Sequence, residues 1–324
     1  MTDRIVLKTD GFELSGFDIV SVKNRIDWLA GYFDLTATNK ALSVLNKAKA
    51  HVKCGADCTL SVDGKKTFTG YIDKVVKGYL NGIPCLRVVG SSLVGDAVES
   101  DLTGKTYKNQ TAPQILNDIL SGFNIGLNSR LIGCETLDVF TVNPAEKCLS
   151  AIARLLDRTN AVLFSTADGT LCLMRRENAE PANVQIITGQ SDVVAASCID
   201  DGATDFAKIV LIGQNGLADE HDIASICGAS METVLPSERR KQKVVYADNV
   251  SQSRLDKEAA KCRKAQKKIT LSVKGWQTVG LNGVVAVSDD WLDLNGGYRV
   301  AGLCLSYDEK GGHRTTFELE AADV

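Results

Sequence analysis

The chain of 324 residues exceeds the usual length of one domain, so two or three packed units with a sizeable core are expected. Hydrophobic residues make up 44% and charged residues 24%, the composition of a folded, soluble protein. The formal net charge of −3 and the lack of a long apolar run exclude two function classes. We expect neither direct nucleic-acid binding nor stable membrane insertion.

Ten cysteines are scattered almost evenly along the chain, and the N-terminal segment MTDRIVLKTDG lacks the apolar stretch of a secretion signal. Reduced thiols in a bacterial-type cytosol are therefore expected, and not a disulfide framework. The closest pair, Cys54 and Cys58, has no second pair beside it, and three histidines are too few to complete a zinc site convincingly. We expect no metal and no cofactor.

The first part of the chain predicts a series of short strands. In TFTGYIDKVVKGYLNGIPCLRVVG, strands 67–76 and 83–90 meet at Asn81-Gly82, a pair that suits a tight hairpin turn. Alternation in CTLSV predicts another strand at 58–62. Several short strands with close turns favour a closed sheet, because closure removes exposed edges. Residues 1–102 are predicted to form a first antiparallel β-barrel domain.

The middle of the chain changes to helical periodicity. Thr111–Gln114 (TAPQ) has the N-cap, early proline and third-position amide of a helix start, and Asn143–Glu146 (NPAE) predicts a second start. The side chains expected to be buried on these helices are Ile115, Leu116, Ile119, Leu149, Ile152 and Leu156. A hairpin about Asp168-Gly169 follows, so residues 103–182 are predicted to form a small α+β insert.

The last part of the chain returns to strands, and residues 183–324 are predicted to form a second β-barrel domain. The strands are expected at 207–212, 269–274, 284–288, 298–307 and 314–321. A basic helix near 253–268, with Leu255, Ala259 and Cys262 at helical intervals, is expected to cover a sheet. Its lysines and arginines are expected to be solvated, although contact with an acidic partner or with nucleic acid stays open.

The two β regions resemble each other in the order of their features. Gly70-Tyr71, the turn at Asn81-Gly82 and the strand IPCLRVV have a counterpart in Gly297-Tyr298, a turn at Gly311-Gly312 and the strand RTTFELE. The fold class is therefore mainly β with an α+β insert. It comprises two related, tube-like antiparallel β-barrel domains and a small domain of helices and a hairpin.

A search for reactive groups finds no convincing active site. Gly104–Thr106 (GKT) ends like a phosphate-binding loop, but Glu99 occupies the position of the required first glycine. The histidines lie far apart, in no recognised nucleophile context. They are His51, His221 and His313.

Asp289–Trp291 (DDW) is a conceivable sugar site, or a turn whose tryptophan covers the end of a barrel. No catalytic, cofactor-binding or metal-binding residue is identified, and the partner-binding residues stay unknown. The residues therefore favour a scaffold or binding module over an enzyme.

Several strings along nearly the whole chain resemble, in order, the baseplate hub proteins of contractile-tailed phages, in particular the group of phage Mu tail protein P and the late control protein D. The strings are LAGYFDLTAT (29–38), GADCTLSVDG (55–64), TFTGYIDKV (67–75), VVGSSLVGDAVES (88–100), TYKNQTAPQILNDI (106–119), NPAEKCLSAIARLLDRTNAVLFSTADGTLCLMRR (143–176) and GYRVAGLCLSYDEKGGHRTTFELEA.

This resemblance implies a homotrimeric structural hub, not an enzyme, in the tail baseplate of a virion assembled in the host bacterial cytoplasm. Its implied partners are other copies of itself, the central spike protein, the tail tube protein and other baseplate proteins. A tube ring has six subunits and a spike has three, so a chain with two related barrels would reconcile the two symmetries.

Two alternative functions remain open from the sequence. A tail-associated cell-wall hydrolase would need paired carboxylates or a nucleophile in one cleft. A glycan-binding β module would need exposed aromatic side chains, and the chain has only 3 Trp, 7 Tyr and 9 Phe.

Overall fold

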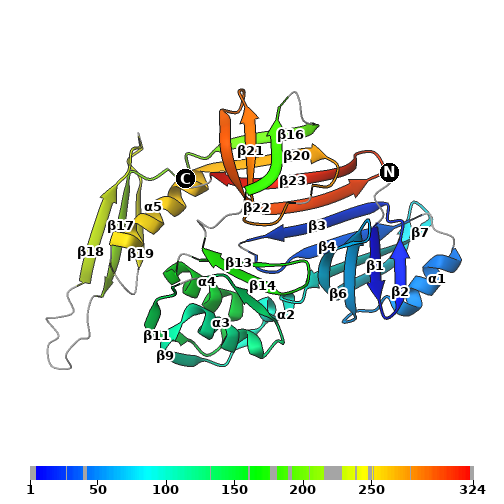
Figure 1. Ribbon diagram of the computed structural model, residues 1–324, viewed down its shortest axis with the longest axis horizontal. Coiled ribbons are helices and arrows are strands. Elements are labelled where there is room, and N and C mark those ends of the chain that lie inside the picture. The colour runs from blue at the N-terminus through cyan, green and yellow to red at the C-terminus, as the bar shows by residue number, and fades with distance from the viewer. Residues whose placement is uncertain are drawn as a thin grey trace. The chain divides into compact units, whose positions relative to one another are not determined.

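The computed structural model describes most of the chain, and contacts within it define two compact units (Figure 1). The described residues are 5–26, 28–38, 42–131, 133–159, 161–175, 181–188, 192–203, 205–214, 228–237, 239–246, 250, 252–277 and 279–321. The first unit comprises Met1–Ala195 with Leu271–Val324, and the second comprises Ala196–Thr270.

Strands dominate the chain. The helices are α1 (Leu42–His51), α2 (Gly95–Glu99), α3 (Ala112–Ser121), α4 (Cys148–Thr159) and α5 (Gln252–Gln266). The strands before α3 are β1 (Ile5–Thr9), β2 (Phe12–Ser15), β3 (Ile19–Arg25), β4 (Tyr32–Ala37), β5 (Asp57–Val62), β6 (Lys65–Leu80), β7 (Ile83–Ser92), β8 (Asp101–Leu102) and β9 (Lys105–Thr111). The strands between α3 and Asp200 are β10 (Leu127–Ser129), β11 (Thr136–Val142), β12 (Glu146–Lys147), β13 (Ala161–Ser165), β14 (Leu171–Arg175), β15 (Pro181–Ile187) and β16 (Val193–Asp200). The remaining strands are β17 (Lys208–Gln214), β18 (Gly228–Val234), β19 (Gln242–Tyr246), β20 (Lys267–Lys274), β21 (Val284–Asp289), β22 (Leu294–Asp308) and β23 (Gly312–Ala321).

One large sheet joins the first and last β regions. Its strand order is β16-β20-β23-β22-β3-β4-β7-β6-β5-β1-β2, with β21 beside β22 and β15 beside β21. The connection is the antiparallel pair of β22 with β3. Among the described residues this order stays open, so the two closed barrels expected from the sequence are not found. The expectation assumed that each region would cover its own edges, whereas the edge of β3 is covered by a strand from the other region.

Two runs of five strands in this sheet have the same connectivity. In the first repeat, β3 to β7 lie in the order β3-β4-β7-β6-β5, and in the second repeat, β16 and β20 to β23 lie in the order β16-β20-β23-β22-β21. The register of the last hairpin shifts at Asp73 on β6 and at Ala301 on β22. Segments of equal length, Lys74–Leu80 and Gly302–Asp308, then lead to the turn. The internal duplication expected from the sequence is therefore present as a shared topology.

The bulges correct the alignment of the two repeats by one residue. Counting back from the bulges makes Gly70 of the first repeat equivalent to Tyr298 of the second. The sequence strings had indicated Gly297 as its equivalent. Buried positions agree with the corrected alignment: Cys58 with Val285, Leu60 with Val287, Ile72 with Val300, and Val88 with Phe317. Equivalent residues thus pack into the core in both repeats.

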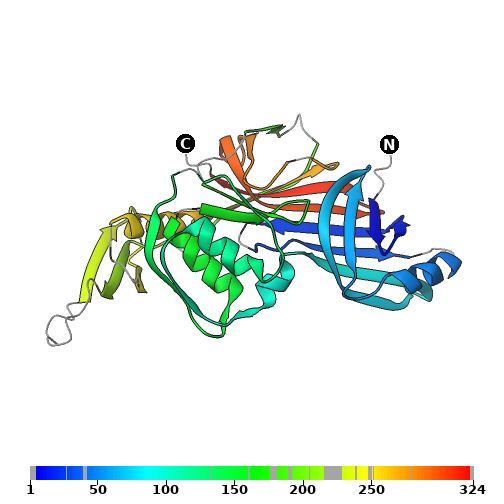
Figure 2. The ribbon, with the colours of Figure 1, turned by 60° about the horizontal axis from the view of Figure 1, so that its bottom comes forward.

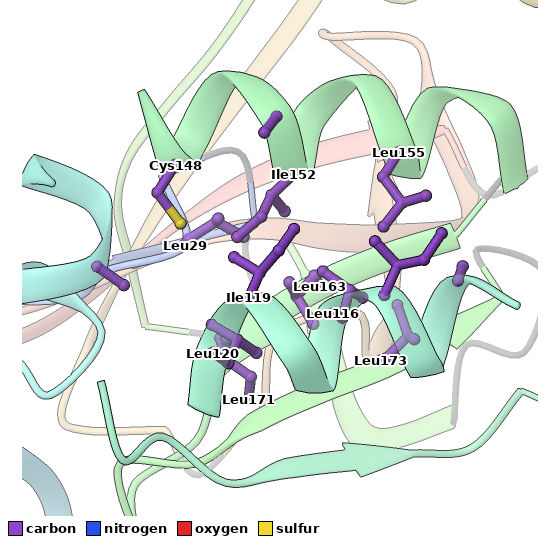
Figure 3. Close-up of a cluster of buried hydrophobic side chains, with 14 of the residues drawn as sticks. Leu29, Leu116, Ile119, Leu120, Cys148, Ile152, Leu155, Leu163, Leu171 and Leu173 are labelled. Atoms are coloured by element: carbon purple, nitrogen blue, oxygen red, sulfur yellow. The ribbon is translucent and has the colours of Figure 1, made fainter. Parts of the chain in front are cut away.

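The α+β part between the repeats packs α3 and α4 side by side over the β10-β14-β13 sheet, as the turned view shows (Figure 2). The core between these helices contains Leu116, Ile119 and Ile152 (Figure 3). These residues and Ile115 are buried as predicted, whereas Leu149 and Leu156 are only partly buried.

The two predicted helix starts have different outcomes. Helix α3 begins as predicted, and the backbone N–H and hydroxyl of Thr111 both donate to Oε1 of Gln114, at 2.9 and 3.1 Å. Helix α4 begins only at Cys148, because Ala145 has a left-handed φ of 60° that a helix cannot contain. Glu146 lies in the short strand β12 beside β8.

The second unit is a three-stranded sheet, β18-β17-β19, with α5 against one face. Leu255, Ala259 and Cys262 of α5 are buried against Ile209 and Leu211 of β17, so the covering helix predicted near 253–268 is confirmed. None of the described helices combines the length and apolar character needed to cross a membrane.

Candidate assembly surface

The segment that resembles a phosphate loop has a structural role. The ammonium group of Lys105 donates to Oδ2 of Asp118 at 2.7 Å, and the hydroxyl of Tyr107 donates to the same oxygen at 2.7 Å. The bond from Lys105, followed by the bond from Tyr107, lowers the pKa of Asp118. These contacts tie β9 to α3, so Lys105 is occupied in holding a carboxylate.

The two described histidines contact aromatic rings. His51 stacks on Phe12 with ring centroids 4.9 Å apart. His313 stacks on Tyr307 at 4.6 Å and meets the edge of Trp276 at 4.4 Å. The third histidine, His221, lies outside the described residues. These rings therefore help to pack the ends of strands and helices.

The loop at Asp289–Trp291 is a turn fixed by its first carboxylate. Oδ2 of Asp289 accepts from the hydroxyl of Thr188 at 2.6 Å, and Oδ1 accepts from the backbone N–H groups of Trp291 and Leu292 at 3.0 Å each. These bonds, the one from Thr188 first, lower the pKa of Asp289. Trp291 is 90% exposed, so of the two interpretations from the sequence, the one in which this side chain covers the end of a barrel does not hold.

The cysteine pair considered as a metal candidate is divided between two environments. Cys54 is exposed, whereas Cys58 is buried in the core of the first repeat, where burial raises the pKa of its thiol to about 12. In the described ranges of the chain, no three His, Cys, Asp or Glu side chains are grouped so that they could hold a metal ion.

Two strand edges are the prominent surface features of the large sheet. The outer half of β6, Lys74–Leu80, pairs with β7 alone in the described chain, because β5 pairs only with β6 residues up to Tyr71. The equivalent segment of β22, Gly302–Asp308, has β23 on one side and β3 on the other. We call Lys74–Leu80 the β6 edge.

The second feature is the first strand of the second repeat, Val193–Asp200, which we call the β16 edge. In the strand order of the described residues it has one neighbour, β20, whereas the equivalent strand β3 lies between β4 and β22. Within the described strands, each edge therefore lacks the neighbour that its equivalent in the other repeat has.

The side chains of the β16 edge are unusual for a free strand edge, whereas the β6 edge carries two lysines, Lys74 and Lys77, beside exposed apolar side chains. Tyr79 on the β6 edge is 78% exposed, and Ile199 on the β16 edge is 53% exposed. The β16 edge reads VVAASCID and carries no charge before Asp200. Free edges are normally protected by charges, proline or irregularity, so an uncharged exposed edge indicates a surface for strand pairing. Alternating residues predicted strands in the chain, but no local pattern shows which strand lacks a neighbour.

Comparison with known proteins matches the N-terminal region to a phage family. Residues 4–92 match the family described as "Mu phage baseplate assembly protein GpP-like, N-terminal". The chain is also similar to the baseplate hub protein gp44 of Escherichia phage Mu, with 25% identity over 196 residues. That match covers 59% of this chain and 50% of gp44, so it spans about half the length of the curated relative.

Solved structures share the fold over nearly the entire chain. The 43 kDa tail protein of prophage MuSo2 from Shewanella oneidensis has a TM-score of 0.82 and 21% identity, covering 100% of this chain and 99% of that one. A tail protein from Neisseria meningitidis MC58 has a TM-score of 0.85 and 16% identity, covering 99% and 97%.

A secretion protein has the same fold at greater distance. The E. coli c3393 protein, described as a component of the type VI secretion system, has a TM-score of 0.59 and 14% identity, covering 97% of this chain and 76% of that one. The resemblance to phage baseplate proteins expected from the sequence is thereby confirmed.

Proposed function

From this likeness to phage baseplate and tail proteins, we propose that the chain is a structural baseplate hub: a trimeric adaptor between a sixfold tail tube and a threefold central spike. The observation that carries the proposal is the presence of two repeats with the same five-strand connectivity in one chain.

The duplication supports the proposal through symmetry. Three copies of a chain with two similar repeats present six similar surfaces, while the ring as a whole keeps threefold symmetry. The sixfold tube would contact the surfaces that the repeats share, and the threefold spike would contact features that differ between them. The predicted domains 1–102 and 183–324 supply the repeats in this proposal, and the insert 103–182 connects them.

A structural role also accounts for the polar groups described above. Lys105, Asp289 and the described histidines are engaged in contacts that position strands and helices. We therefore propose a protein without enzymatic activity, located in the tail baseplate of a virion and assembled in the host bacterial cytoplasm. Its partners would be other copies of itself, the spike, the tube and neighbouring baseplate proteins.

Imaging of assembled tails tests this function. Tails that carry a tagged version of the chain should show three tags at the junction between tube and spike, with six similar β repeats in the ring. A strain that lacks the chain should assemble no junction, whereas restoring the chain should restore it. Tails that assemble normally without the chain, or that carry the tag away from the junction, would contradict the proposal.

A further inference from the structure

We propose that the β6 edge of one copy pairs with the β16 edge of a second copy as antiparallel strands. This inference rests on the proposed hub function and deepens it by naming the surfaces that join the copies. It starts from the two edges which, in the part of the chain that the structure describes, lack the neighbour that their equivalents have in the other repeat.

The template for this contact is the pairing of β3 with β22 within the chain, and we call such a pairing between two repeats a joint. Strand β3, the first strand of the first repeat, pairs antiparallel with Gly302–Asp308 of β22, the fourth strand of the second repeat. In that register Arg25, the last residue of β3, lies opposite Gly302, and Ile19 lies opposite Asp308. The joint thus connects the first strand of one repeat to the fourth strand of the other.

Because the repeats are equivalent, the first strand of the second repeat and the fourth strand of the first repeat could form the same kind of pair. Strand β16 is the first strand of the second repeat, and Lys74–Leu80 is equivalent to Gly302–Asp308 of the fourth strand. Transferring the register places Asp200, the last residue of β16, opposite Lys74, and places Val194 opposite Leu80.

This register brings together groups that favour pairing. The carboxylate of Asp200 comes opposite the ammonium group of Lys74, and opposite charges on facing strands stabilise a sheet. Ile199 comes opposite Val75, which packs against the core of the first repeat. The joint would therefore cover apolar surface that is exposed on the isolated chain.

The arrangement also explains how copies could form a ring. Each chain carries one β6 edge and one β16 edge, so the contact is head to tail, and it closes when the rotation between copies returns to the start. Joints within chains and between chains then alternate around the ring. Three copies would close a continuous wall of six repeats.

The native cysteine on β16 allows a direct test. In the proposed register Cys198 lies opposite Val76, and facing residues of antiparallel strands are about 4.5 to 5.5 Å apart at Cα, a separation that a disulfide spans. Mild oxidation of the full-length Val76→Cys variant should give covalent dimers and trimers on a non-reducing gel. The Val76→Cys/Cys198→Ser variant should give none, which excludes bonds to other cysteines. Gly78→Cys, placed two residues out of register, should crosslink much less.

A charge exchange tests the register without oxidation. Lys74→Glu and Asp200→Lys should each weaken assembly by about fivefold per joint, or about a hundredfold for a ring of three joints, and the double variant should recover most of the loss. Lys77→Glu changes the charge equally but faces Ser197 in this register, so it serves as the control. Light scattering over a concentration series measures the assembly.

The outcomes separate this inference from the hub function. A trimer whose Val76→Cys variant forms no bond with Cys198, and whose charge exchange gives no recovery, would overturn the joint while leaving the hub intact. A chain that stays monomeric at all concentrations and never crosslinks would overturn it too. The hub function itself depends on the imaging of tails described above.

Discussion

Glu146 shows how one carboxylate can stabilise a turn where the sequence predicted a helix start. Its two oxygens accept from the guanidinium group of Arg154 at 2.9 and 2.8 Å, and Oε2 also accepts from the backbone N–H of Asn143 at 2.9 Å. These bonds, with that from Arg154 first, hold the pKa of Glu146 below its ordinary value of 4.5.

The pH dependence of stability should reveal this interaction. As the pH falls below about 4.5, Glu146 takes up a proton in the unfolded chain before it does so in the folded chain. The ionised carboxylate therefore stabilises the folded chain above that pH, and this stabilisation is lost as the pH falls through the pKa of the folded chain. The difference in unfolding free energy between the wild type and Glu146→Gln should therefore shrink between pH 7 and about pH 3, as measured by urea unfolding. Glu135→Gln, an exposed change in the same insert, controls for net charge. A difference that stays constant with pH would refute the role of Glu146.

Ile152 is the most informative core residue in the insert. Its side chain is buried between α4 and α3 (Figure 3), so Ile152→Ala should lower the unfolding free energy by about 2 to 5 kcal/mol. Leu156→Ala on the same helix should cost less, because Leu156 is only partly buried. Denaturant unfolding followed by circular dichroism compares the two, and equal losses would contradict the packing described here.

At the scale of single elements, the β6–β7 hairpin depends on its turn. Asn81 and Gly82 have φ values of 49° and 79°, the left-handed region that tight hairpin turns require. Gly82→Ala should destabilise the protein by about 1 kcal/mol, because a Cβ atom is strained at positive φ even where space is open.

Gly122 is the matched control for that substitution. It lies at the end of α3 with a φ of −64° and has equally open space, so Gly122→Ala should be neutral or stabilise by up to about 1 kcal/mol. Thermal unfolding of both variants measures the difference. Equal effects at the two positions would show that backbone strain does not matter at the hairpin.

Local sequence patterns predicted these elements well where local forces determine them. The TAPQ motif predicted the start of α3 because its contacts lie within one turn of helix. The NPAE motif gave the wrong start for α4, because the pairing of Glu146 with Leu102 on a distant strand competes with the helix. A motif of four residues contains no information about that partner.

At the scale of the whole molecule, the pairing of β3 with β22 joins the two β regions in one sheet, so we expect these regions to unfold together. Hydrogen exchange should show similar protection for the amides of β3 and β22, because opening either strand breaks the same joint. The amides of β17 lie in the second unit and should exchange at a separate free energy. Measurement by mass spectrometry at increasing denaturant tests this, and a β3 that exchanges well before β22 would contradict the joint.

The long-range joints are the part of the fold that the sequence could not supply. The order of turns and strands predicted a duplication, and the structure has two repeats of matching connectivity. The described strands form no closed barrel, because the edge of β3 is covered by a strand nearly three hundred residues away and not by a strand of its own region. For the same reason the sequence did not identify assembly residues. An edge such as β6 or β16 can be recognised only when the order of all strands in the sheet is known.

The placement of the second unit within the second repeat has a consequence for how such chains can diversify. The excursion from Ala196 to Thr270 leaves from β16 and returns on β20, which are adjacent strands in the sheet. Adjacent strands lie about 4.8 Å apart, a gap that a short turn can bridge. Evolution could therefore enlarge or exchange this appendage without rewiring the scaffold. The equivalent strands β3 and β4 of the first repeat are also neighbours, and there the short segment between Arg25 and Tyr32 makes the connection.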